Sequence, residues 1–451
     1  MNRVVIETGA KNYQIFQQKD GFAEITLNGS VITEGTKEGE YKVFATVAYE
    51  DTQEMLFWWK ECKLNGKKWS VTLTVPTGGP YTIKTCANFN HPEFMEWSRR
   101  GDSIFHVGVG DLFVIAGQSN SAGYSKDFAY DPAESGVHLL GNDKEWHLAV
   151  HPLQDSSFCD SPNTDGSNCG ISMYLTFAKY LKRYLNYPIG LIQSALGGST
   201  LNNWNEFLYS NMLDSINVAG GSIKAFLWHQ GCSETGNETN AKAYKERFLK
   251  MKEKLCMDIN NPDLPVFMFQ LNRHIARTGN SIYWGVVNEN IRQLKNEKNI
   301  YVIPTSDGTL SDGIHNDAFS NLKFGERLAK TVLNKLYNKQ FLCNAPDIKS
   351  AEMQKDGSVI LTFENIVDKI YTFECAPEML EIDAVDSCGE VHISDFEEIF
   401  PDKLRLVFPR KLEKGAVINC SWKANRMGVV PCDYANHIPT LSFMNVKIKN
   451  L

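Results

Sequence analysis

The chain has 451 residues, of which 43% are hydrophobic and 22% are charged, and its net charge at pH 7 is -7. This length predicts two or three domains, and the composition is that of a globular protein. The negative charge without any basic block argues against a partner that is nucleic acid or an anionic membrane surface. No apolar stretch is long enough to predict a helix that spans a membrane.

The N-terminus and the cysteines bear on the compartment of the protein. The first residues lack the apolar segment of a secretory signal. The eleven cysteines are scattered and form no Cys-x-x-Cys pair, so zinc-finger and thioredoxin spacings are absent. Free thiols in a reducing environment are the favoured interpretation. Together these features predict a cytoplasmic protein.

Residues 1–108 are predicted to form a β domain. Apolar and polar side chains alternate over 69–75, which is typical of a half-buried strand. Another strand is predicted over 41–49, and a further alternating run begins after the turn at Gly78-Gly79-Pro80. Closely spaced strands without helical periodicity predict a small β-sandwich of jelly-roll type.

Residues 109–340 differ in character, because short apolar strands alternate there with amphipathic helical stretches. This alternation predicts a parallel sheet with helices on both of its faces. The predicted strands are 112–116, 189–193, 223–228, 266–271 and 300–303. The predicted helices are 171–185, 241–255, 282–295 and 322–336.

Residues 341–451 return to a β pattern after a predicted linker at Asn344-Ala345-Pro346-Asp347. Strands are predicted over 358–363 and 404–408, separated by residues that favour turns. A second β-sandwich is therefore expected at the C-terminal end of the chain.

Four predicted strands of the middle segment end in polar or glycine-rich loops. Parallel strands carry such loops to one edge of the sheet, so we expect a shared crevice. The residues delivered there are Gln118, Ser119 and Asn120, then Gly197 and Gly198, then Gln230, and then Asn272 and Arg273.

Ser119 follows a buried strand and a glycine, and Asp312 and His315 lie three residues apart further along the chain. Serine, histidine and aspartate are the side chains that acyl transfer through a covalent intermediate requires. Asp307 is a rival for the acidic position. Cys232 beside a histidine suggests a cysteine nucleophile, although a free cysteine is more often an inert apolar residue.

Other side chains of the crevice suggest binding. The backbone N–H groups of Ser119 and of Gly197 or Gly198, together with the amide of Gln230, are candidates for an oxyanion hole. Gln118, Asn120, Asn272 and Arg273 are candidates for substrate contacts, and Trp204 is a candidate platform for a sugar ring. No sequence motif of a metal or cofactor site is present, so neither is expected.

Four blocks in this order resemble the SGNH-hydrolase superfamily, in particular its carbohydrate O-acetylesterases of the sialate O-acetylesterase-like branch. The blocks are Gly-Gln-Ser-Asn at 117–120, Ala-Leu-Gly-Gly-Ser at 195–199, Trp-His-Gln-Gly at 228–231 and Asp-x-x-His at 312–315. Two departures stand out. Relatives often carry an acid directly after the third block, where this chain has Cys232, and Met after the first block, where this chain has Ser121.

The resemblance implies a flavodoxin-like three-layer α/β/α catalytic domain over 109–340, between the β-sandwich domains 1–108 and 341–451. It also implies a serine esterase with the triad Ser119, Asp312 and His315. Its expected partner is an acetylated mono- or oligosaccharide, and a homo-oligomer stays open. Two alternatives remain: a carbohydrate-binding protein without catalytic activity, and an SGNH lipase or thioesterase. The sequence does not name the sugar.

Overall fold

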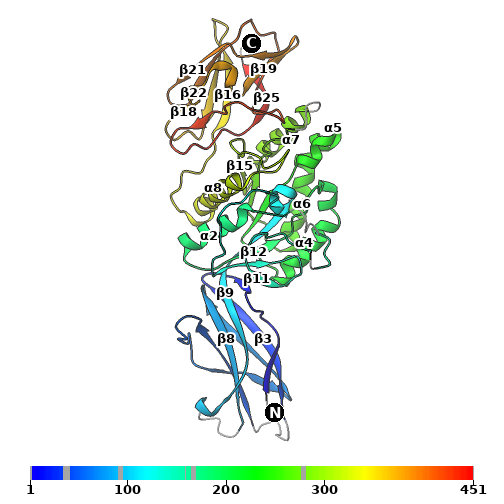
Figure 1. Ribbon diagram of the computed structural model, residues 1–451, viewed down its shortest axis with the longest axis vertical. Helices are drawn as coiled ribbons and strands as arrows, with labels where there is room; N and C mark the ends of the chain where they lie inside the picture. Colours follow the sequence, from blue (N-terminus) through cyan, green and yellow to red (C-terminus); the bar gives the residue numbers. More distant parts are fainter. Residues whose placement is uncertain are drawn as a thin grey trace.

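The computed structural model describes residues 3–33, 41–89, 95–157, 159–163, 169–275 and 281–449. Figure 1 shows a mixed α/β molecule in which three parts follow one another along the longest axis. The N-terminal strands lie at one end, a sheet covered by helices lies in the middle, and the C-terminal strands lie at the other end. None of the helices in the described ranges is long and apolar enough to cross a membrane.

The N-terminal strands form two groups around one hydrophobic core. One sheet has the order β1-β3-β7-β6, and β4 pairs with β5 and β8, which in turn pairs with β9. Apolar side chains from both groups fill the same core, as the alternating pattern predicts. The strands are β1 (Arg3–Thr8), β2 (Ile15–Gln17), β3 (Phe22–Ile32), β4 (Lys42–Tyr49), β5 (Lys60–Glu61), β6 (Lys63–Asn65), β7 (Lys68–Pro76), β8 (Gly78–Asn88) and β9 (Arg99–Gly117), and η1 (Met95–Trp97) precedes β9.

The long strand β9 connects the first two parts. Its residues from Arg99 to Val109 pair with β8, and its residues from Asp111 onward pair with the strands of the middle sheet. The sequence boundary predicted between residues 108 and 109 therefore falls inside a continuous strand.

The middle sheet has the order β11-β10-β12-β9-β13-β14-β15. All neighbouring pairs are parallel except β10 and β11. Its elements are α1 (Ser119–Ala122), β10 (Val137–Leu140), β11 (Trp146–Leu148), α2 (Met173–Leu185), β12 (Ile189–Gln193), α3 (Leu201–Trp204), α4 (Phe207–Val218), β13 (Ala225–His229), η2 (Cys232–Gly236), α5 (Glu238–Lys242), α6 (Tyr244–Asp258), β14 (Val266–Phe269), α7 (Ser281–Leu294), β15 (Ile300–Ile303) and α8 (Ala318–Tyr337).

Helices cover both faces of this sheet, which explains the uninterrupted apolar runs of its strands. Leu112, Val114 and Ala116 of β9 belong to one core, together with residues of α3, α4, α6 and α7. Phe113 and Ile115 belong to the other core, together with residues of α2 and α8. Every residue of β9 from 112 to 116 is fully buried.

The C-terminal strands form a sheet with the order β20-β19-β23-β25-β16-β17-β22-β21, beside the pair β18-β24. They enclose their own core. The elements are β16 (Asp347–Met353), β17 (Val359–Glu364), β18 (Ile370–Tyr371), η3 (Pro377–Met379), β19 (Ile382–Asp386), β20 (Gly389–His392), β21 (Asp395–Ile399), β22 (Lys403–Val407), β23 (Val417–Cys420), β24 (Cys432–Asp433) and β25 (Phe443–Lys449).

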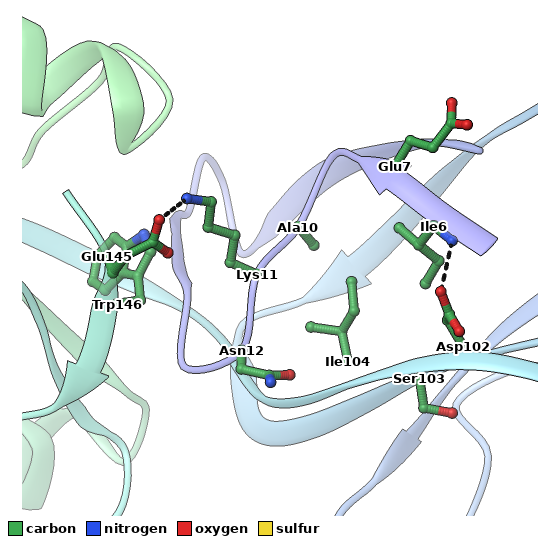
Figure 2. Close-up of a pocket in the computed structure, with 10 residues that line it drawn as sticks. All are labelled: Ile6, Glu7, Ala10, Lys11, Asn12, Asp102, Ser103, Ile104, Glu145 and Trp146. Atoms are coloured by element: carbon green, nitrogen blue, oxygen red, sulfur yellow. Dashed lines mark hydrogen bonds and ion pairs between the residues drawn. The ribbon is translucent and has the colours of Figure 1, made fainter. Parts of the chain in front are cut away.

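A pocket of about 440 Å³ marks the junction between the N-terminal strands and the middle sheet (Figure 2). Lys11 forms an ion pair with Glu145 across it, at 2.7 Å. Asp102 accepts a hydrogen bond from the backbone N–H of Ile6 and pairs with Arg3 at 2.7 Å. The pair of Lys11 and Glu145 thus links the loop after β1 to the middle part, and Asp102 holds β1 against β9.

Candidate active site

The turn after β9 presents Ser119 at the carboxyl end of the central strand. Gly117 has φ 127°, and a Cβ atom at this position would lie 2.2 Å from the carbonyl oxygen of His229. Only glycine fits this close approach to β13. The N–H of Gln118 then donates to the same carbonyl at 3.0 Å, so the turn is fixed against the neighbouring strand. Ser119 itself is 6% exposed.

Asp312 and His315 form a bonded pair in the loop between β15 and α8. Nδ1 of His315 lies 2.7 Å from Oδ2 of Asp312, and Oδ1 of Asp312 accepts the backbone N–H groups of Ile314 and His315. Burial alone would raise the pKa of Asp312, but these hydrogen bonds outweigh it and hold the pKa below its usual value. Asp312 is thus an ionised acceptor that orients the imidazole of His315 through Nδ1.

Asn120 joins the serine turn to the histidine loop. Its Nδ2 donates to the carbonyl of Ile314 at 3.2 Å, and its Oδ1 accepts the N–H of Asn316 at 3.0 Å. These partners are the residues on either side of His315, and Asn120 is adjacent to Ser119. Two hydrogen bonds across more than 190 positions of sequence therefore hold Ser119 and His315 on neighbouring segments.

Asp307, the rival for the acidic position, has a different set of partners. Arg327 of α8 donates to both of its carboxylate oxygens, at 2.9 and 2.6 Å, and Lys323 lies 3.1 Å away. These cations outweigh the effect of burial and hold the pKa of Asp307 below its usual value. Asp307 thus anchors α8 and is not bonded to His315.

The glycine loop after β12 lies against the serine turn. The N–H of Leu196 donates to the carbonyl of Gly117 at 3.0 Å, and the hydroxyl of Ser199 donates to the same oxygen at 3.2 Å. Gly198 is exposed with φ 67°. Within the described ranges, no acceptor takes the backbone N–H of Ser119 or of Gly198. These two groups are therefore the donors of the crevice with unused bonding capacity.

The predicted role of Gln230 as an oxyanion donor does not fit this structure. Gln230 is fully buried, and its Nε2 donates to the carbonyl of Ser199 at 3.1 Å and to Oε1 of Glu234 at 3.2 Å. Both amide hydrogens therefore have internal acceptors. Gln230 instead ties the glycine loop to η2.

Glu234 is a buried carboxylate that the sequence analysis did not single out. Besides Gln230, its Oε1 accepts the N–H of Leu201 at 2.7 Å, and its Oε2 lies 3.5 Å from Nη1 of Arg247. Glu234 could have been recognised from the sequence, because it lies two residues after Cys232 and relatives often carry an acid near the Trp-x-Gln-Gly block. Here that acid braces the start of α3.

We predict that Glu234→Ala lowers the free energy of unfolding by about 2–4 kcal/mol, because buried donors lose their acceptor. Urea denaturation followed by circular dichroism measures this change. The matched control is Glu238→Ala, which removes only an exposed pair with Lys242 on α5 and is expected to leave the midpoint unchanged. Equal midpoints for both variants would contradict the role of Glu234.

Several predicted substrate contacts prove to be internal. Trp204 is fully buried, donates from Nε1 to Ser199 at 2.9 Å and packs edge-on against Trp228, so the prediction of a sugar platform is wrong. Gln118 is 3% exposed, and its Oε1 accepts the N–H of Gly231 at 3.0 Å. Asn120 and Asn272 are 4% and 2% exposed. Their side chains serve to connect loops.

Arg273 is the predicted contact that keeps access to solvent. It is half-buried, and its Nη2 donates to Asn425 at 3.1 Å. The next residue but one, Ile275, donates its N–H to the carbonyl of Gly313 at 2.9 Å. Arg273 thus lies beside the loop that carries Asp312 and His315.

The alternative built on Cys232 lacks a base. His229 is fully buried and lies against Phe269, with ring centroids 5.1 Å apart and the ring planes tilted by 35°, and burial lowers its pKa to about 3. Among the described residues, neither of its ring nitrogens has a hydrogen-bond partner. No cluster of three or more metal-ligating side chains occurs in the ranges that the structure describes.

The aromatic ring of Tyr124 lies beside His315, and the sequence analysis did not predict this contact. It is 6% exposed, and its ring centroid lies 5.1 Å from that of His315. Nothing in the local sequence distinguishes this tyrosine, because it reaches the histidine only through the fold.

A parallel sheet with a serine turn and an aspartate–histidine loop at one edge defines a hydrolase. Residues 109–334 match the family described as carbohydrate esterase, sialic acid-specific acetylesterase. The chain belongs to this family of carbohydrate esterases, and its class of reaction is ester hydrolysis.

Two relatives illustrate the similarity. The chain is 27% identical over 246 residues to a probable carbohydrate esterase, At4g34215, from Arabidopsis thaliana, which covers 49% of this chain and 90% of that protein. It is also similar to the crystal structure of XAC1771, a novel carbohydrate acetylesterase from Xanthomonas citri. That match has a TM-score of 0.67 at 17% identity and covers 98% of this chain and 99% of the other. At this identity the second match establishes the fold alone.

Proposed function

We propose that the protein is a serine esterase that removes acetyl groups from carbohydrate hydroxyls through an acetyl-enzyme. The observation that carries the proposal is the pair of hydrogen bonds between Asn120 and the residues flanking His315, one donated and one accepted by Asn120, which holds the histidine beside the turn of Ser119. The bond from His315 to Asp312 completes the arrangement. Nucleophile, base and orienting acid are the three groups that such a reaction needs.

The proposed reaction has two halves. Oγ of Ser119 attacks the acetyl carbonyl carbon while its proton passes to Nε2 of His315. The tetrahedral intermediate collapses, the bond to the sugar oxygen breaks, and His315 returns the proton to that oxygen. Water then attacks the acetyl-enzyme with His315 as base, and acetate leaves as Ser119 recovers its proton. Asp312 stabilises the imidazolium in both halves.

We assign the oxyanion hole to backbone donors. The N–H groups of Ser119 and Gly198 have no acceptor among the described residues and belong to two turns that are bonded to each other through the carbonyl of Gly117, and Gly197 belongs to the same loop as Gly198. Fixed N–H donors stabilise a developing oxyanion by about 3 kcal/mol each. The buried bonds of Gln118 and Gln230 hold these donors in place.

We also propose the finer arrangement of the fold. The order β12-β9-β13-β14-β15 corresponds to 2-1-3-4-5, which is that of flavodoxin-like sheets, and the turn of Ser119 follows the strand at its switch point. This order supports a three-layer SGNH-type domain over 109–340. We propose in addition that the β parts on either side, 1–108 and 341–451, are β-sandwich domains.

The substrate is proposed to be an acetylated sugar, and an acetylated sialic acid is one member of that class. Ser119 is almost enclosed and Tyr124 packs beside His315, which favours a small acyl group. Arg273 at the rim is the side chain suited to a sugar carboxylate.

The test is the release of acetate from a panel of O-acetylated sugars, acidic and neutral, together with p-nitrophenyl acetate and octanoate. We predict release of acetate from at least one sugar and a kcat/KM for acetate about 10-fold or more above that for octanoate, because a narrow site excludes the longer chain. Preference for octanoate would support a lipase or thioesterase. Binding of glycans without hydrolysis would support an inactive carbohydrate-binding protein.

A further inference from the structure

A buried arginine from the C-terminal strands reaches the proposed active site. Arg426 lies between β23 and β24 and is 3% exposed. Its Nη1 donates to the carbonyl oxygen of Asn272, and its Nη2 donates to Oδ1 of the same residue at 3.2 Å. Asn272 follows β14 of the middle sheet, so the contact spans 154 positions of sequence.

The contact continues to the catalytic loop. Nδ2 of Asn272 donates to Oδ1 of Asn316 at 2.9 Å, and the N–H of Asn316 donates to Asn120 at 3.0 Å. Asn316 directly follows His315, and Asn120 directly follows Ser119. A single chain of hydrogen bonds therefore connects Arg426 to the neighbours of both residues.

The guanidinium sets the direction of this chain. Arginine can only donate, so Oδ1 of Asn272 must face Arg426, and Nδ2 must face Asn316. Asn316 then accepts through Oδ1 and donates through Nδ2, to Asn321 at 3.3 Å. Without Arg426, the buried amide of Asn272 would lose the partner that fixes its orientation.

Backbone contacts bring the same segments into register. The N–H of His274 donates to the carbonyl of Ala424 at 2.9 Å, and the N–H of Ile275 donates to that of Gly313 at 2.9 Å. The segment after β14 thus lies between the C-terminal loop and the loop of His315.

Burying the charged side chain of Arg426 costs desolvation free energy that packing alone does not offset. Among the described residues it has no carboxylate at ion-pair distance, and its Nε has no partner. Burial lowers its pKa to about 10, with Glu381 opposing this and Arg273 adding to it. A buried cation without an ion-pair partner lowers stability, so a role in specifying geometry explains the burial of Arg426 better than packing does.

We propose that Arg426 is a positioning residue, through which the C-terminal strands fix the loop of His315 relative to Ser119 by way of Asn272 and Asn316. This inference rests on the proposed serine-esterase function. It makes the C-terminal strands part of the working enzyme.

The experiment compares Arg426→Met, which removes the donors, with Arg426→Lys, which keeps a charged donor. Asn272→Ala breaks the next link while Arg426 stays. Arg405→Met is the matched control, because Arg405 belongs to β22 and pairs with Asp356 away from the site. For each protein we would measure the rate constant and final extent of Ser119 labelling by a fluorophosphonate, and kcat and KM for p-nitrophenyl acetate.

We expect Arg426→Met and Asn272→Ala to lower the labelling rate constant and kcat by about 10- to 100-fold, because small displacements of a catalytic base are costly. The final extent of labelling and KM should stay near those of the wild type. Arg426→Lys should recover part of the loss, and Arg405→Met should behave as wild type.

Three outcomes would overturn the proposal. One is an unchanged rate constant in both Arg426→Met and Asn272→Ala. Another is a loss confined to the extent of labelling, which indicates fewer folded molecules. The third applies if Arg426→Met does not fold: an unchanged labelling rate constant in Asn272→Ala alone would then overturn the proposal. A wild type that is not labelled at Ser119 would instead refute the serine-esterase function itself.

Discussion

Ser119→Ala is expected to lower kcat for acetate release by about 10⁴-fold or more, because loss of the nucleophile removes the covalent route entirely. The protein should remain folded, since the backbone carbonyl of Ser119, which accepts from the N–H groups of Gly123 and Tyr124, is unchanged by the substitution. Acetate release at saturating substrate measures the first effect, and thermal unfolding measures the second.

Ser121→Ala is the matched control for this variant. The hydroxyl of Ser121 is fully buried and bonds the carbonyl of Ala116 at 2.8 Å and the hydroxyl of Tyr174 at 2.9 Å. Its loss should lower the free energy of unfolding by about 1–2 kcal/mol and leave turnover per folded molecule intact. Comparing the two variants thus distinguishes a loss of catalysis from a loss of stability. Turnover retained by Ser119→Ala would refute the assignment.

The middle sheet could be predicted from the sequence because its strands are buried on both faces. Runs such as 112–116 and 189–193 are continuously apolar, and they correspond to parts of β9 and to β12. The hairpin β10–β11 and helix α4 were not predicted, because neither has a strong periodic pattern. The helix predicted over 241–255 is interrupted at Ala243 and forms α5 and α6.

The orientation of the side chains in the site could not be predicted from the sequence. Residue type and position after a strand indicate that a side chain lies near the crevice, but they do not tell which way it points. Trp204 and Asn272 have the chemistry of ligand contacts, and both are buried and internally bonded. Arg426 is 154 positions from its partner, so no local pattern connects it to the site.

The internal bonds of the crevice have a common consequence. Polar side chains that internal hydrogen bonds hold in place reorganise little when charge develops, which favours electrostatic stabilisation of a transition state. Gln118, Asn120 and Gln230 each have at least one such bond close to Ser119, although Oε1 of Gln230 has no partner among the described residues. Their polar character therefore serves rigidity, whereas the half-buried Arg273 keeps access to solvent.

The two aspartates before α8 give the second large prediction. Asp312→Asn should lower kcat by about 10⁴-fold, because an amide at this position no longer fixes the tautomer of His315 or stabilises its cation. Asp307→Asn should leave kcat per folded molecule unchanged and lower the free energy of unfolding by about 1–3 kcal/mol, since it weakens the pair with Arg327. Kinetics normalised by Ser119 labelling, alongside urea denaturation, measure both effects. If instead Asp307→Asn lost turnover and Asp312→Asn kept it, Asp307 would be the acid of the site and the bond at Nδ1 of His315 would have no catalytic role.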